Sequence, residues 1–558
     1  MSGVKLDAGR VKQARQEEMR YFRKKGVYKK IPRAEAKKNG WPIVKVRWID
    51  VNKGDEDNPN YRSRLVAKEF KGGAESDWDL FAGTPPLEAL KMLISEAATV
   101  ADGGGKKKSM LIADVSRAFF EAKARRNVCV ELVDEDLIDG ENADDLVGHL
   151  HLSMYGTRDA AYNWQEEVAS TLKRWGFRRG RFNPCTYFHE QLDIKALVHG
   201  DDFVAVASAK SLSWFQKELE QRFEIKSARL GTGKDDEREA KVLNRVIRVT
   251  DSGWMYETDQ RHAELLVEAF DLQEARPVCT PGEDLKSWEV EVDSAELNEA
   301  DSSSFRKLVA RANYLALDRA DIQFAVKDLC RAMSKPRVGD MKKLKRLARY
   351  LLGKPRMIQQ YEWQGVVQEV EVFGDSDWAG CKDSGKSTSG GAIFLGSHVI
   401  KTWSRSQKTV ALSSGEAELI AMVKATAEGL GILSLAQDWK LDKTLIVLAD
   451  STAALGIVKR KGAGKLRHIN VGMLWIQNLQ EEEKIRYEKV FGPQNPADLM
   501  TKNVGGALLE EHCRRLRLLA EEGRAAKASK VSRGVFSSAC RQRRSWIDFK
   551  SYFQMNEH

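Results

Sequence analysis

Three aspartates in the first half of the chain have types and positions suited to nucleotidyl transfer. Asp114 ends the apolar segment MLIAD, and Asp201 and Asp202 lie between two apolar runs in ALVHGDDFVAV. Nucleotidyl transfer uses two divalent cations about 4 Å apart, and Mg²⁺ prefers oxygen ligands. Two strands that end in aspartate would supply them. A Gly-Asp-Asp segment is also common in plain hairpin turns, so the surrounding sequence must decide between the two interpretations.

Four further acids follow in the second half of the chain. Asp375 ends EVEVFGD, Glu418 lies in the helical segment SSGEAELIAMVKA, Asp450 ends TLIVLAD, and Asp498 begins a helix in NPADLMTK. Together these four acids could hold two cations that activate water. Alone, each could be a helix cap or a first-turn acid. Glu416 is an alternative ligand. We prefer Glu418, because apolar residues flank Glu418 in the segment AELIAM.

The elements that must position these acids follow from the hydrophobic pattern. The first acids require a strand and a hairpin, and the last acids require alternating strands and helices. We expect a charged helix within 8–40, a hairpin over 41–72, a helix over 87–100, a strand over 109–115, a hairpin over 194–207, helices over 303–352, and strands alternating with helices over 370–504.

Composition restricts the class of protein. The chain has 558 residues, 42% of them hydrophobic and 31% charged, and a net charge of +10. This length suggests three or four domains, and the basic surplus is compatible with a polyanionic partner. The seven cysteines are scattered, which excludes a Cys-x-x-Cys zinc cluster and argues against a disulfide framework. We find no signal peptide and no uninterrupted apolar membrane span, and expect no membrane partner.

The chain resembles one known family through a series of motifs in a fixed order. They are YRSRLVAKEF, ADVSRAFFEA, SMYGTRDAAYNW, VHGDDF, RPVCTP, NYLALDRADIQFAVKDLCRAMSKP, GDSDWAGCKDSGKSTSGGAIFLG, TVALSSGEAELIA and NPADLMTK. From about residue 10 to residue 504, the sequence is similar to the reverse transcriptase and ribonuclease H region of copia-type LTR retrotransposon Pol polyproteins.

The resemblance implies two active sites, each with two Mg²⁺ or Mn²⁺ ions. The polymerase ligands would be Asp114, Asp201 and Asp202, and the ribonuclease H ligands would be Asp375, Glu418, Asp450 and Asp498.

The resemblance also implies a nucleotide site. Phe119 would be the aromatic gate that excludes a ribose 2′-hydroxyl, although its type fits a core aromatic equally well. Arg64 and Lys68 would contact the incoming triphosphate, or they could be surface charges. His468, in LRHIN, would lie near the ribonuclease H site, or it could be a surface histidine.

Two departures from the family pattern bear on fidelity and rate. His199 and Gly200 precede the aspartates where the family usually has Tyr-Val, and Asp159 stands where the family usually has glutamine. We expect Gly200 to loosen the turn and Asp159 to bring an acid near the template–nucleotide pair. Neither change removes a metal ligand.

The expected fold class is a multidomain α/β and α+β protein. A right-hand polymerase of fingers, palm and thumb would precede a ribonuclease H-like domain with a mixed sheet. The expected domains are an N-terminal charged helical segment (1–40), fingers and palm (41–282), a helical thumb and connection (283–368), the ribonuclease H-like domain (369–505) and a basic tail (506–558).

We therefore predict an RNA-directed DNA polymerase with a C-terminal ribonuclease H. Its partners would be an RNA template, a DNA primer, an RNA–DNA hybrid and dNTPs, and it would work in the cytoplasm or a virus-like particle with access to the nucleus. The alternatives are a divergent or domesticated remnant that binds nucleic acid without polymerising, and an enzyme that retains only ribonuclease H activity.

Overall fold

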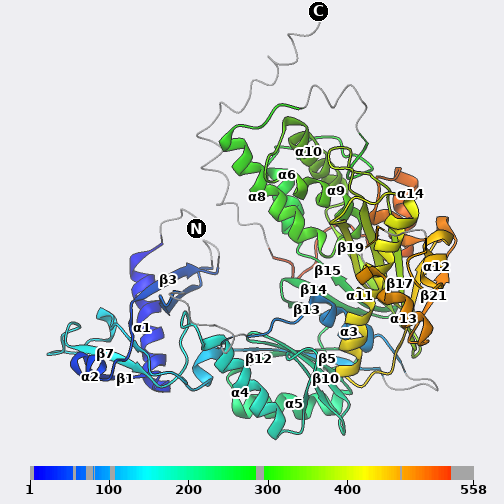
Figure 1. Cartoon of the computed structure of the whole chain (residues 1–558). Helices are drawn as coiled ribbons and strands as arrows, with labels where there is room; N and C mark the ends of the chain where they lie inside the picture. The colour runs from blue at the N-terminus through cyan, green and yellow to red at the C-terminus, as the bar shows by residue number, and fades with distance from the viewer. Residues whose placement is uncertain are drawn as a thin grey trace, which may run out of the picture. The chain divides into compact units, whose positions relative to one another are not determined.

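The chain forms two compact units, each described here by itself (Figure 1). The first is drawn from residues 1–82 and 117–170, and the second from 83–116 and 171–529. The computed structural model describes residues 6–54, 58–70, 80, 82–100, 107–284, 294–464, 468–469 and 471–529.

The first unit combines a long helix with a small sheet and a hairpin. Helix α1 begins where the Asp7 side chain accepts a hydrogen bond from the Arg10 N–H (2.8 Å), and it ends at Gly26 in the left-handed conformation. The predicted hairpin is present as β3 and β4. The elements are α1 (Ala8–Lys25), β1 (Tyr28–Pro32), α2 (Arg33–Lys38), β2 (Ile43–Val44), β3 (Val46–Asn52), β4 (Tyr61–Ala67), β6 (Cys129–Val130) and β7 (Leu146–Leu150), with sheet order β1-β7-β6-β2.

A six-stranded sheet in the second unit carries the first group of acids. Its order is β12-β5-β11-β10-β9-β8, and strand β5, which lies next to the edge strand β12, is buried at every residue except Asp114. The predicted strand over 109–115 and the predicted hairpin over 194–207 are both confirmed. The elements are α3 (Leu87–Ala97), β5 (Ser109–Val115), β8 (Arg178–Arg179), β9 (Thr186–His189), β10 (Ile194–His199), β11 (Asp202–Ala207), α5 (Ala209–Arg222) and β12 (Ile225–Leu230). Helix α4 (Ala160–Arg174) runs from the first unit into the second.

A second sheet and a helical cluster follow in the chain. The sheet has the order β13-β14-β15-β16-β22, and the helices share one apolar core. The elements are β13 (Glu239–Val242), β14 (Arg245–Thr250), β15 (Gly253–Glu257), α6 (Arg261–Glu268), α8 (Glu299–Ala316), α9 (Ala320–Arg331), α10 (Val338–Gly353), β16 (Met357–Glu362), α14 (Gly506–Arg515) and β22 (Leu518–Ala520).

The third sheet carries the second group of acids. Strands β19, β18 and β17 are antiparallel, whereas β20 and β21 run parallel to β17, in the order β19-β18-β17-β20-β21. The long helix α11 packs on β17, β18 and β20. The elements are β17 (Glu369–Ser376), β18 (Thr388–Leu395), β19 (His398–Ser406), α11 (Ser414–Asp438), β20 (Thr444–Ala449), α12 (Thr452–Val458), α13 (Trp475–Glu481) and β21 (Ile485–Lys489).

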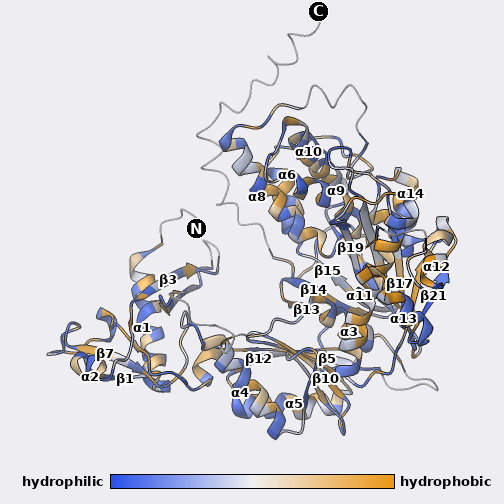
Figure 2. Cartoon of the chain, viewed as in Figure 1, coloured by the Kyte–Doolittle hydropathy of each residue, from blue (hydrophilic) through white to orange (hydrophobic). Residues whose placement is uncertain are grey.

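Helix α11 is the one helix in the described ranges that is long and apolar enough to cross a membrane by length and composition. Half of its most apolar window is buried inside the structure. Figure 2 shows hydrophobic residues along α11 where it lies beside β17. Its apolar surface therefore contributes to the core over the third sheet.

The predicted fold class is confirmed: the structure is a mixed α/β protein with several sheets, and the third sheet has both parallel and antiparallel strands. The predicted domain boundaries stay predictions. The predicted segment 1–40 holds β1 and α2 as well as α1, and the predicted tail holds α14 and β22. Strand β22 pairs with β16, so ordered structure continues beyond residue 505 to at least Ala520.

A buried cluster around Asp318 joins three elements of the second unit. The Lys91 ammonium of α3 and the Arg245 guanidinium of β14 each lie 3.0 Å from the Asp318 carboxylate. The Tyr256 hydroxyl of β15 donates to it at 2.8 Å. These two cations hold the pKa of Asp318 below its usual range although burial acts to raise it. Asp318, which lies in the motif segment NYLALDRAD, therefore has a structural role.

We predict that Asp318→Ala destabilises the second unit by about 3–5 kcal/mol, because it leaves two buried cations without their shared carboxylate. Asp235→Ala, at an exposed aspartate, should stay within about 0.5 kcal/mol of the wild type. Chemical denaturation followed by tryptophan fluorescence measures both. Equal stability of the two variants would show that the Asp318 cluster contributes nothing to the fold.

Candidate metal centres and nucleotide site

The three polymerase candidates lie on neighbouring strands of the first large sheet. Asp114 and Asp202 are directly opposite each other in the antiparallel register of β5 and β11, which places their Cβ atoms about 5 Å apart. The Asp201 carbonyl accepts a hydrogen bond from the Val115 N–H (2.9 Å), so the turn is fixed to the end of β5. The strand pairing thus places Asp114 beside Asp202, with Asp201 in the adjoining turn.

The turn before these aspartates differs from the expectation. His199 pairs with Asp202, which leaves Gly200 and Asp201 as a two-residue loop. Gly200 has φ of 62°, a left-handed conformation that glycine adopts without strain. Glycine is the residue that so tight a hairpin favours, and the expectation that Gly200 loosens the turn stays a prediction.

The electrostatics of this edge favour a bound cation. Burial, together with the nearby Asp201 and Asp114 carboxylates, raises the pKa of Asp202 to about 6. A carboxyl whose pKa is raised by its neighbours is stabilised in its charged form by a cation placed between them.

The C-terminal acids form the tightest acidic cluster in the described part of the chain. Asp375, Glu418 and Asp450 each place one carboxylate oxygen within 4.8 Å of the others. Asp375 is near the end of β17, and Asp450 directly follows β20. Because these strands are parallel neighbours, their carboxyl ends meet at one edge, and α11 brings Glu418 to the same place.

This cluster fits a divalent cation. Glu418 Oε2 is buried and has no hydrogen-bond partner among the described residues. Burial and the charges of Asp375 and Asp450 raise the pKa of Glu418 to about 9, and burial and Asp498 raise the pKa of Asp375 to about 7. The donor set consists of oxygens, as Mg²⁺ and Mn²⁺ prefer.

Asp498 lies beside this cluster, in a short 3₁₀ helix (Pro496–Met500). Its Oδ2 pairs with the Lys502 ammonium at 2.9 Å. The fully buried Thr501 hydroxyl donates to Asp375 Oδ2. Sequence analysis did not single out Thr501 or Lys502, although both belong to the motif NPADLMTK.

Glu416 and His468 pair with each other. Glu416 Oε2 lies 2.9 Å from His468 Nε2 and accepts a hydrogen bond from the Leu412 N–H (2.9 Å). Glu416 is therefore engaged at the start of α11, whereas Glu418 faces Asp375 and Asp450. This geometry supports the preference for Glu418.

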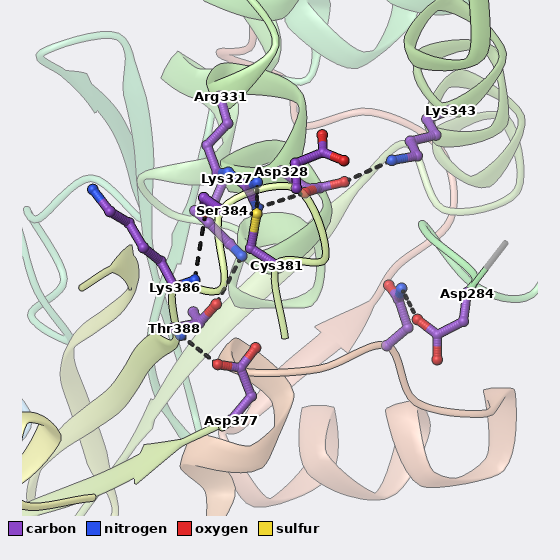
Figure 3. A network of polar contacts seen from close by, with 12 residues as sticks. Asp284, Lys327, Asp328, Arg331, Lys343, Asp377, Cys381, Ser384, Lys386 and Thr388 are labelled. Carbon is purple, nitrogen blue, oxygen red and sulfur yellow. Dashed lines mark hydrogen bonds and ion pairs between the residues drawn. The ribbon is translucent and has the colours of Figure 1, made fainter. Parts of the chain in front are cut away.

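The segment after Asp375 is fixed to helix α9 by a polar network (Figure 3). The Lys327 ammonium donates to the Thr388 hydroxyl (2.9 Å), and the Thr388 N–H donates to Asp377. Nearby, Arg331 and Ser384 donate to the Cys381 sulfur. These contacts hold the β17–β18 connection against α9.

Two of the three nucleotide-site candidates share an aromatic neighbour in the first unit. The Arg64 guanidinium lies 4.9 Å from the centre of the Tyr155 ring, and the Phe119 ring centre lies 4.9 Å from the same ring. Phe119 is half-buried, whereas the adjacent Phe120 is fully buried in the core. Lys68 is bonded through its backbone N–H to the Lys45 carbonyl (2.7 Å). Sequence analysis missed Tyr155, although it lies in the quoted motif SMYGTRDAAYNW.

Asp159 is not a free acid. It is buried and accepts hydrogen bonds from Arg126 (2.7 Å) and Asn163 (2.8 Å). Arg126 also holds Glu69 through two hydrogen bonds of 2.8 Å each. Arg126 lowers the pKa of Asp159 against the opposing effect of burial. The charge of Asp159 is therefore neutralised within the first unit by Arg126.

Comparison with known proteins shows similarity to reverse transcriptases and to transposon polyproteins. Residues 31–282 match the family described as reverse transcriptase (RNA-dependent DNA polymerase). The retrovirus-related Pol polyprotein from transposon TNT 1-94 of Nicotiana tabacum is 26% identical over 505 residues, which cover 88% of this chain and 36% of that protein. The corresponding polyprotein from transposon RE1 of Arabidopsis thaliana is 25% identical over 473 residues, covering 82% and 31%.

Among solved structures, a foamy viral protease-reverse transcriptase in complex with an RNA/DNA hybrid is 12% identical, with a TM-score of 0.48. That match covers 88% of this chain and 54% of the viral chain. The chain spans about a third of the length of the transposon polyproteins. Residues 31–282 thus match the reverse transcriptase family, and most of the chain is similar to retrovirus-related Pol polyproteins of transposons.

Proposed function

We propose that the protein is an RNA-directed DNA polymerase that also cleaves the RNA strand of RNA–DNA hybrids. The observation that carries this proposal is the presence, in one chain, of two separate groups of carboxylates at the ends of sheet strands. The match of residues 31–282 to the reverse transcriptase family supports the first activity, and the mixed sheet that carries the second group of carboxylates supports the second.

In the polymerase site, Asp114, Asp201 and Asp202 would hold two Mg²⁺ or Mn²⁺ ions. These ions would activate the primer 3′-hydroxyl and stabilise the leaving pyrophosphate. Phe119 would stack below the sugar and exclude a 2′-hydroxyl, with Tyr155 supporting its ring. Arg64 and Lys68 would bind the triphosphate, and the Tyr155 ring would orient the Arg64 guanidinium.

In the ribonuclease H site, Asp375, Glu418, Asp450 and Asp498 would hold two further ions. These ions would activate water and stabilise the leaving 3′-oxygen. Thr501 would orient the Asp375 carboxylate through its hydrogen bond. Lys502, paired with Asp498, would keep Asp498 at the margin of the site until substrate arrives.

The partners would be an RNA template, a DNA primer, the RNA–DNA hybrid and dNTPs, held mainly through phosphates. The site of action would be the cytoplasm or a virus-like particle, with access to the nucleus for the DNA product.

Primer extension on poly(rA)·oligo(dT) with Mg²⁺ or Mn²⁺, beside cleavage of a labelled RNA–DNA hybrid, tests the proposal. Both activities are expected. Cleavage without extension would instead favour an enzyme that retains only ribonuclease H. Binding of the hybrid without either reaction would favour a domesticated binding protein.

We predict that Asp201→Asn abolishes DNA synthesis but leaves hybrid cleavage within about twofold of wild type, because the two carboxylate groups are separate. The matched substitution Asp251→Asn, at an exposed aspartate, should leave both rates unchanged. Both reactions are measured on the same purified proteins. Loss of both activities in a folded Asp201→Asn protein would contradict the assignment of separate sites.

We predict that Phe119→Ala admits ribonucleotides and costs less than about 2 kcal/mol of stability, because the ring is half-buried. Phe120→Ala should instead cost about 3–5 kcal/mol, as for a core phenylalanine, without changing sugar selectivity. Single-nucleotide incorporation with dNTP and rNTP measures selectivity, and chemical denaturation measures stability. A Phe119→Ala protein that is strongly destabilised and still rejects ribonucleotides would identify Phe119 as a core residue.

We predict that Asp375→Asn raises the metal-free melting temperature at pH 8 by roughly 3 °C, equivalent to about 1 kcal/mol. The pKa of Asp375 in the folded protein, about 7, is above its unfolded value. The wild type therefore loses stability as pH rises from about 4, the unfolded pKa, through about 7, the folded pKa. Because Asp375→Asn lacks this charge, the difference in melting temperature between Asp375→Asn and the wild type should grow as pH rises over this range.

Adding Mg²⁺ or Mn²⁺ should raise the melting temperature of the wild type and raise that of Asp375→Asn by less than half as much. Asp383→Asn, at a largely exposed carboxylate, should behave as the wild type. Differential scanning fluorimetry with and without EDTA measures these shifts. Equal metal-induced shifts in wild type and Asp375→Asn would contradict a metal site at Asp375.

A further inference from the structure

Helix α11 connects the ribonuclease H candidate site to the sheet that carries the polymerase aspartates. Glu418 lies near its start, and Asp438 is its last residue. At 1.5 Å per residue, the helix spans roughly 30 Å between them. A single continuous helix therefore runs from one site to the sheet of the other within the second unit.

The far end of α11 is seated in the turn between β8 and β9. The buried Asp438 carboxylate accepts the backbone N–H groups of Arg181 (2.8 Å), Phe182 (3.1 Å) and Asn183 (2.8 Å). It also accepts the Asn183 side-chain amide (3.1 Å), and the Thr186 hydroxyl lies 3.1 Å from it. One carboxylate thus accepts three consecutive backbone N–H groups of the turn.

The helix itself does not favour an acid at this position. The carboxyl end of a helix carries partial negative charge, so an aspartate there is unfavourable. The turn supplies the compensating donors, and it is shaped for the acid. A Cβ added at Gly180 would lie 2.1 Å from Thr186 Oγ1, and 2.6 Å from both Asp438 Oδ2 and the Asn183 carbonyl oxygen. Glycine leaves the space that the carboxylate occupies.

The next residue extends the contact to the strand that leads to the polymerase aspartates. Trp439 is fully buried, and its indole N–H donates to the Ala196 carbonyl of β10 (3.3 Å). Strand β10 continues to His199 and the Asp201–Asp202 turn. Regular secondary structure and buried hydrogen bonds therefore join Glu418 to Asp202 without a break.

We propose that Asp438 is a positioning residue that fixes the separation between the two metal sites. It thereby sets the distance between the primer 3′ end and the RNA phosphodiester that is cut. This inference rests on the proposed function, because it presupposes both activities. Its readout is the position of the cut, which a residue needed only for folding would not move.

The test uses Asp438→Asn in the full chain, with Asp442→Asn as the matched control at an exposed aspartate four residues further on. Asparagine keeps the shape but turns one acceptor oxygen into a donor that faces the donors of the turn. Hydrogen–deuterium exchange at residues 181–183 should become at least tenfold faster in Asp438→Asn and stay unchanged in Asp442→Asn.

Cut positions are then mapped on an end-labelled RNA annealed to a recessed DNA primer. Wild type and Asp442→Asn should cut at one dominant distance from the primer 3′ end. Asp438→Asn should spread the cuts over several nucleotides while total cleavage stays within about twofold. Gly180→Ala, which crowds the same carboxylate from the turn, should produce the same spread if Asp438→Asn does not fold.

Two results would overturn the inference: unchanged exchange at residues 181–183 in Asp438→Asn, or faster exchange with the same single cut position. A wild-type protein that cuts no RNA would overturn the proposed function instead. The exchange experiment needs no catalytic activity, so the two failures are distinguishable.

Discussion

Repulsion between partly buried carboxylates is the constraint on which both candidate sites depend. At each site, strand pairing forces acids together that would repel one another in the absence of a cation. Burial raises the pKa values of Asp202, Asp375 and Glu418 most, and repulsion from the neighbouring carboxylates raises them as well. The fold therefore holds these groups where their charge is unfavourable, which is an arrangement that a divalent cation relieves.

Several buried carboxylates outside the two sites have partners that stabilise their negative charge. Asp318 is buried between Lys91 and Arg245, Asp159 is bonded to Arg126, and Asp438 accepts the donors of a turn. Each of these acids has partners that stabilise its charged form. The contrast between satisfied acids and mutually repelling ones distinguishes structural carboxylates from candidate metal ligands within the same chain.

Much of the local structure could be predicted from the sequence, because it depends on short-range patterns. The apolar run ending at Asp114, the hairpin around Asp201 and the strands ending near Asp375 and Asp450 all form as expected. The resemblance to a known family gave the order of the acids, and the parallel pairing of β17 and β20 explains why they meet.

Partners supplied from distant parts of the chain could not be predicted. Nothing near Asp159 in the sequence indicates that Arg126 neutralises it, and nothing near Glu416 indicates its pairing with His468. The left-handed conformation of Gly200 depends on the two-residue turn that β10 and β11 form, which the sequence expectation did not consider. Thr501 and Tyr155 lay inside recognised motifs, but only the folded geometry connects them with Asp375 and Phe119.

The central claim is that this chain contains two separate divalent-cation sites. Anomalous X-ray scattering from crystals of the full chain with an RNA–DNA hybrid and Mn²⁺ tests it most directly. The account predicts manganese peaks among Asp375, Glu418 and Asp450 and between Asp114 and Asp202. A well-ordered structure with no manganese peak at one of these positions would contradict it.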